Sequence, residues 1–217
     1  MARIEVYLEV GSKRAFAGAL DWPGWARSGK TEQEALDRLT EYGPRYAVVP
    51  EQAGLRLPAT YDFEVVERLP GSSTTDFGAP DAIASADHQK LTAAQAGRLA
   101  DLVEACWATL DRVAAESPPE LRKGPRGGGR DRDKMVQHVV SSEASYARQI
   151  DIRHREPAFN DHDAVAALRR DISAALRAAR DATPARPNGW PPRYAARRIA
   201  WHVLDHAWEM EDKRHPA

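Results

Sequence analysis

Apolar and polar positions divide the chain into two differently patterned parts. Residues 3–10 alternate between apolar and mostly charged side chains, the period of a strand with one buried face. A Gly-Ser turn follows, so we expect residues 14–20 to return as the second strand of a hairpin. Thr31 with a glutamate three residues later is a capping box and predicts a helix that ends near residue 43. Residues 61–69 again alternate as a strand.

From Thr92 onward the apolar period lengthens to about 3.6 residues, which is typical of amphipathic helices. Four helices are expected, at about 92–117, 131–152, 161–182 and 193–213. The glycine-rich segment 123–130 predicts an irregular loop, and four prolines within 183–192 separate the last two helices. Short connections favour antiparallel neighbours in a bundle.

These patterns predict an α+β fold with two domains. A small ββαβ module would occupy residues 1–70, and a linker rich in glycine, serine and threonine would follow at 71–90. Residues 91–217 would form a four-helix bundle.

Composition narrows the function classes only slightly. The formal net charge of −1 provides no global basic field, so nucleic-acid binding is not favoured. The single cysteine, Cys106, excludes an intrachain disulfide framework. No apolar run approaches the roughly 20 residues of a membrane span, and the first residues do not resemble a signal peptide. We therefore expect a cytoplasmic protein without a membrane partner.

Three histidines share the apolar faces of two predicted helices. His202 and His206 lie four residues apart in the fourth helix, and His138 occupies an equivalent apolar stripe in the second. The remaining histidines, expected on the surface, are His88, His154, His162 and His215. Three imidazoles gathered in an apolar interior would leave ring nitrogens unpaired unless they bind a metal. The pattern therefore predicts a three-histidine site for a divalent ion, with a fourth position left for water or substrate.

Three further residues could assist such a site. Glu209 lies one turn beyond His206, and Ser142 and Tyr146 lie one and two turns beyond His138. Each could orient a ligand or relay a proton. The alternatives are a solvated helix end for Glu209 and ordinary core packing for Tyr146.

The second helix reads Met135-Val-Gln-His138-Val-Val-Ser-Ser-Glu143-Ala-Ser-Tyr146, and the fourth carries H-x-x-x-H within Arg197–Glu209. From residue 91 to 215 this order of motifs resembles the DinB/YfiT-like metalloenzyme superfamily. The resemblance implies a four-helix bundle with zinc, nickel or a similar ion on His138, His202 and His206. It also implies transfer reactions that use a low-molecular-weight thiol on a small-molecule substrate, and often a homodimer.

The N-terminal part carries two competing motifs. Gly24 to Thr31 satisfies G-x-x-x-x-G-K-[ST], the loop that cradles nucleotide phosphates. The large parallel sheet of a nucleotide hydrolase is not expected after residue 90, which argues against this reading. The run from Ala15 through Asp21-Trp22-Pro23-Gly24 to Glu34-Ala-Leu36 instead resembles the HicB-like module of antitoxin proteins.

The leading hypothesis is therefore a metal-dependent enzyme, either a thiol-dependent transferase or a hydrolase. The rival from another class is a non-enzymatic regulatory protein of the toxin–antitoxin type, acting through the HicB-like module. Nucleotide hydrolysis is a third candidate.

Overall fold

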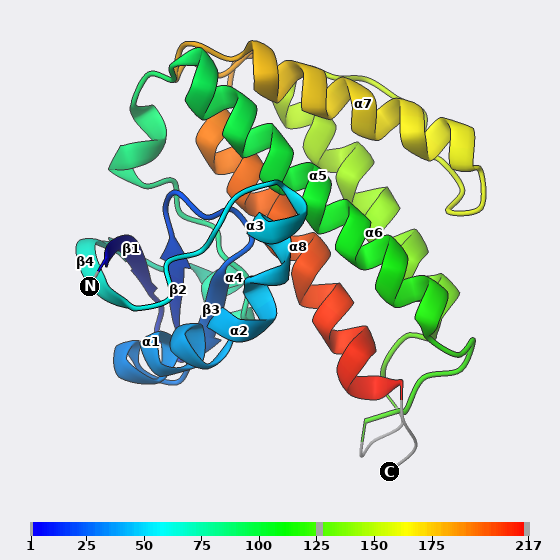
Figure 1. Ribbon diagram of the computed structural model, residues 1–217, viewed down its shortest axis with the longest axis horizontal. Helices are drawn as coiled ribbons and strands as arrows, with labels where there is room; N and C mark the ends of the chain where they lie inside the picture. Colours follow the sequence, from blue (N-terminus) through cyan, green and yellow to red (C-terminus); the bar gives the residue numbers. More distant parts are fainter. Residues whose placement is uncertain (1, 125–127, 215–217) are drawn as a thin grey trace.

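The computed structural model describes residues 2–124 and 128–214. Residues 125–127 of the predicted glycine-rich loop lie outside this range, as does the predicted surface residue His215. The described elements are, in chain order, β1 (Ala2–Val10), β2 (Ala15–Ala19), β3 (Ala26–Gly29), α1 (Glu32–Glu41), α2 (Gly43–Tyr46), α3 (Val48–Gln52), β4 (Tyr61–Pro70), α4 (Ser73–Phe77), η1 (Ser85–His88), α5 (Ala93–Glu116), α6 (Arg132–Ala147), η2 (Arg148–Ile150), α7 (His162–Ala178) and α8 (Pro192–Lys213). Figure 1 shows a sheet region packed beside a group of long helices.

The sheet is mixed, with four strands in the order β3-β2-β1-β4. β1 pairs with β2 in antiparallel register through a tight hairpin. β1 and β4 are parallel, so the chain must cross from one end of the sheet to the other between them. α1, α2 and α3 make that crossover.

The prediction of a ββαβ module is wrong. Residues 26–29 form a third strand that pairs with β2, and two short helices follow α1 before β4. The sequence pattern does not predict β3, because its four residues, Ala-Arg-Ser-Gly, contain no apolar alternation. The strand exists because Gly24, at φ +91°, reverses the chain. Trp25 is fully buried and donates its indole N–H to the Leu39 carbonyl at 2.8 Å.

The same strand conflicts with the phosphate-loop reading of Gly24 to Thr31. A phosphate loop offers free backbone amides, whereas here Trp25 is in the core and residues 26–29 belong to the sheet. Thr31 caps α1 through its side chain instead, accepting the Glu34 backbone N–H. The motif therefore encodes a turn, a strand and a helix start.

One face of the sheet shares its core with the helices. Ile4, Val6 and Leu8 of β1 belong to one continuous apolar cluster with Leu39 of α1 and many residues of α5 and α8. Buried apolar area of this kind is the main source of folding free energy. The sheet and the long helices are therefore stabilised together.

The other face of the sheet is covered by α8 and by residues 71–90, the segment expected as a linker. That segment holds α4 and η1. The buried carboxylate of Glu9 accepts hydrogen bonds from the Thr75 hydroxyl and from the backbone N–H groups of Asp81 and Ala82. These bonds fix the segment to β1.

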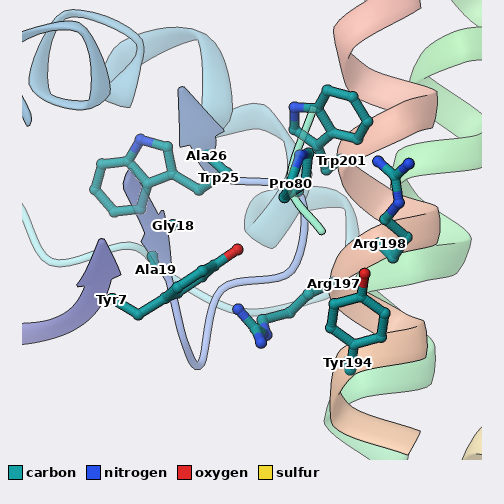
Figure 2. A pocket seen from close by; sticks show the side chains of 11 residues that line it. Tyr7, Gly18, Ala19, Trp25, Ala26, Pro80, Tyr194, Arg197, Arg198 and Trp201 are labelled. Carbon is teal, nitrogen blue, oxygen red and sulfur yellow. The ribbon is translucent and has the colours of Figure 1, made fainter. Parts of the chain in front are cut away.

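A buried ion pair joins this segment to α8. The Arg197 guanidinium pairs with Asp87, and both side chains are almost fully buried. Arg197 also points toward the Tyr7 ring, 4.5 Å from its centroid (Figure 2). Burial is the largest influence on the Arg197 pKa, yet the negative charge of Asp87 keeps that pKa above its ordinary value.

Helices α5–α8 form a bundle-like arrangement. α8 contacts both α5 and α6, and α7 contacts the same two helices from the other side. α8, coloured orange to red in Figure 1, therefore runs alongside α5 and borders the sheet. Across the residues that the structure describes, no helix has the length and apolar character needed to cross a membrane.

Removing Arg197 should weaken the fold strongly. Arg197→Ala leaves the Asp87 carboxylate buried without a counter-charge, which typically costs about 3–5 kcal/mol of unfolding free energy. Arg68→Ala is the matched control, because the pair of Arg68 with Glu32 is exposed and is expected to contribute less than about 1 kcal/mol. Urea unfolding of both variants measures the difference, and equal losses would contradict a stabilising role for the buried pair.

Candidate metal centre

Three imidazoles meet where α6 packs against α8. α6 supplies His138, and α8 supplies His202 and His206, so the two helices must pack side by side to form the site. One ring nitrogen from each of the three lies within 4.8 Å of the other two. His202 and His206 are buried and His138 is half-buried. The arrangement could hold a metal ion, as the sequence predicted.

The spacing of the rings fits a small divalent ion. The Nε2 atoms of His138 and His202 are 3.2 Å apart. Two nitrogens that each lie about 2.0–2.1 Å from a tetrahedral ion are separated by roughly 3.3 Å. The Nδ1 atom of His202, the ring nitrogen that does not face His138, is buried without a hydrogen-bond partner among the described residues. Three protein nitrogens leave one tetrahedral position open.

Two of the histidines are held in the neutral form that binds metals. Burial is the main cause that lowers the pKa of His138, to about 4, and the charge of His206 lowers it further. Burial also holds the pKa of His202 well below its usual value, with His206 and His138 adding to the effect. A neutral imidazole keeps a free lone pair, so both rings can bind an ion without first losing a proton.

Glu209 contacts the third ring, and its helper role stays a prediction. The Nδ1 atom of His206 lies 3.0 Å from a Glu209 carboxylate oxygen, and Lys213 donates to the other oxygen. The bond to His206 is the main reason that the pKa of Glu209 falls to about 2. An ionised carboxylate at Nδ1 favours a proton there, which leaves Nε2 of His206 free for a ligand.

Tyr146 also borders the site. Its ring centroid is 5.6 Å from that of His202, and it packs on Trp190 at 5.1 Å, so the residue contacts both the site and the core. Burial raises the pKa of Tyr146, so its hydroxyl stays protonated at neutral pH. Ser142 is half-buried on α6 between His138 and Tyr146 along the chain.

The sequence analysis missed two cationic residues near the imidazoles. The charges of Arg198 and Arg130 act on His202, and both lower its pKa. Arg198 could have been identified, because residues 198, 202 and 206 are spaced by four and share one stripe of α8. Arg130 could not have been identified in this way, because it lies in an irregular segment before α6, where no periodic pattern predicts the position of a side chain.

The other described histidines lie outside this cluster. His88 and His162 are exposed. His154 pairs with Asp171 through a 2.8 Å contact. Substitutions of these histidines can therefore serve as control variants in tests of metal binding.

Comparison of the chain with protein-family models, curated proteins and solved structures found no match. The resemblances to DinB/YfiT-like and HicB-like proteins therefore stay predictions. Function is inferred from the chemistry of the three-histidine site itself.

The low pKa values of His138 and His202 predict a pH dependence for the metal-free protein. Histidine in an unfolded chain titrates near pH 6.5, so between about pH 6.5 and 4 the unfolded state binds more protons than the folded state. Folding stability should therefore fall as the pH is lowered through this window. Glu209, with a pKa of about 2, stays ionised in the folded protein throughout it.

Urea unfolding of metal-free wild type and His138→Gln at pH 7 and pH 5 checks this expectation. The variant should lose less stability on acidification, because it lacks one of the two depressed imidazoles. An NMR titration that placed the His138 midpoint near 6.5 would show that its environment is not the one described.

Proposed function

We propose that this protein binds one divalent metal ion through His138, His202 and His206 and uses it in a metal-dependent enzymatic reaction on a small molecule. The observation that carries the proposal is the convergence of three ring nitrogens within 4.8 Å inside the fold. Zinc and nickel are the expected ions, because imidazole nitrogen suits both. When bound, such an ion supplies a Lewis-acid centre with one open position, which lowers the pKa of a water or a thiol.

The surrounding side chains support a catalytic role over a purely structural one. A structural zinc site normally has four protein ligands, whereas only three donor groups converge here among the described residues. Glu209 fixes the His206 ring, and the Tyr146 ring packs beside the His202 ring. The chain therefore orients two of its three donor rings.

A thiol cosubstrate would have to come from outside the protein. Cys106 is the single cysteine. It is fully buried in α5, and burial raises the pKa of its thiol far above the ordinary value. It therefore forms no thiolate at neutral pH. The likeness of the α6 and α8 motifs to DinB/YfiT-like proteins supports a reaction in which a low-molecular-weight thiol is transferred.

Metal analysis of the purified protein tests the site. Wild type is expected to retain about one ion per chain after dialysis, and His202→Ala should lose it, because two histidines bind an ion far more weakly than three. His154→Ala is the control and should retain the ion. Equal metal content in wild type and His202→Ala would overturn the assignment.

A cobalt-substituted sample tests the thiol. Addition of a small thiol such as cysteine should produce a sulfur-to-cobalt charge-transfer absorption, since a thiolate can occupy the open position. His206→Ala, with an incomplete ligand set, should show a weaker band or none. A wild-type spectrum unchanged by thiol would remove the thiol from the proposal while leaving the metal site intact.

A further inference from the structure

Arg198 lies one helical turn from the histidine cluster on α8. It precedes His202 by one turn of α8, and side chains four residues apart on a helix are about 6 Å apart at Cβ. Its guanidinium carbon is 4.8 Å from the centroid of the Trp201 ring and 5.4 Å from that of the Tyr146 ring. Figure 2 shows Arg198 beside Trp201 on α8. Because Tyr146 belongs to α6 and borders His202, the guanidinium lies between the two helices that carry the imidazoles.

Arg198 differs from the other arginines near it on α8. Arg193 pairs with Asp21, and Arg197 pairs with Asp87. Over the described residues, 2–124 and 128–214, Arg198 makes no ion pair, and its Nη1 atom is buried without a hydrogen-bond partner. Contact with aromatic faces stabilises the cation but leaves N–H donors unused. A guanidinium that is buried in part and lacks a counter-ion is a ready receptor for an anion.

The carboxylates of α8 closest to the site already have partners. Glu209 bonds to His206 and Lys213, and Asp205 pairs with Arg27 at 2.8 Å. Neither carboxylate pairs with Arg198, whose guanidinium keeps its positive charge one helical turn from His202. A divalent ion at the histidines would increase the local positive charge. An anionic ligand lowers the electrostatic free energy of these charges.

We propose that Arg198 binds an oxyanion of the ligand at the three-histidine centre, so that the accepted small molecule carries a carboxylate or a phosphate group. The planar fork of a guanidinium matches two oxygens of either group. The ring contacts with Trp201 and Tyr146 hold the fork in place before the ligand arrives. This inference rests on the proposed function, because it assigns the substrate class of that same site.

Binding of simple anions to the metal-loaded protein tests Arg198. Acetate and inorganic phosphate are titrated calorimetrically into zinc-loaded wild type, Arg198→Met and Arg198→Lys. Arg198→Met should weaken binding of the preferred anion roughly ten- to hundred-fold, the effect of losing a hydrogen bond to a charged group. Arg198→Lys retains the charge without the fork, so its affinity should fall between the other two. The anion that binds with the higher affinity identifies the group, carboxylate or phosphate, that the site accepts.

Arg214→Met is the matched control, because Arg214 follows the same helix but pairs with Glu116 at 3.1 Å. Its anion affinity should equal that of wild type. Metal content is measured on every sample. Full metal occupancy with equal anion affinity in wild type and both Arg198 variants overturns the inference, as does the failure of metal-loaded wild type to bind either anion. Absence of metal from wild type overturns the proposed function instead.

Discussion

The packing of α8 is the constraint on which the rest of the structure depends. Apolar residues of this helix contact the sheet through Trp201 and join the bundle core through Ile199, Val203 and Met210. Because its neighbours include the sheet, α5 and α6, α8 has little freedom to rotate or slide. A shift of about one ångström would move two imidazoles relative to the one on α6. The geometry of the histidine cluster is therefore maintained by contacts that extend well beyond it.

Burial and charge act together on the cluster. Removing the imidazoles from water disfavours their protonated forms, and nearby arginines increase the effect. Glu209 provides a negative charge at one edge, where it also fixes a ring. A cation placed among neutral nitrogens in such surroundings gains from their lone pairs, while the surrounding positive charge favours a negatively charged fourth ligand. The imidazole lone pairs thus favour the metal, whereas the arginine charges oppose it and favour an anion beside it.

Sequence patterns predicted the long helices well because each carries a sustained apolar stripe. The ends of α5 and α8 fall within one residue of the expected bounds, whereas α6 ends at Ala147, five residues before the expected end. The two histidines on α8 were placed together by spacing alone. The meeting of His138 with them required knowledge of which helices are neighbours, which periodicity does not encode. The apolar stripe that places His138 on an inward face of the second predicted helix supplied that expectation, and the resemblance to known motifs agreed with it.

The N-terminal module was harder to predict. β3 is short and lacks alternation, and α2 and α3 occupy only four and five residues, so none has a period that can be recognised. Their conformations depend on tertiary contacts such as the stacking of Trp25 on Tyr46, with ring centroids 5.3 Å apart. Arg198 shares the stripe of His202 and His206, so its place beside them could be predicted from spacing, but the sequence does not show that its guanidinium lacks an ion pair.

The turn at Gly24 has one more consequence. A Cβ atom built on this glycine would lie 2.6 Å from a methyl carbon of Leu204, midway between the two histidines of α8 in sequence. Backbone of the β-rich region thus lies directly against the Leu204 side chain, on the helix that carries two of the three histidines. A fragment starting at residue 91 would leave Leu204 and Ala200 facing water, so the sheet region shields part of the surface of α8.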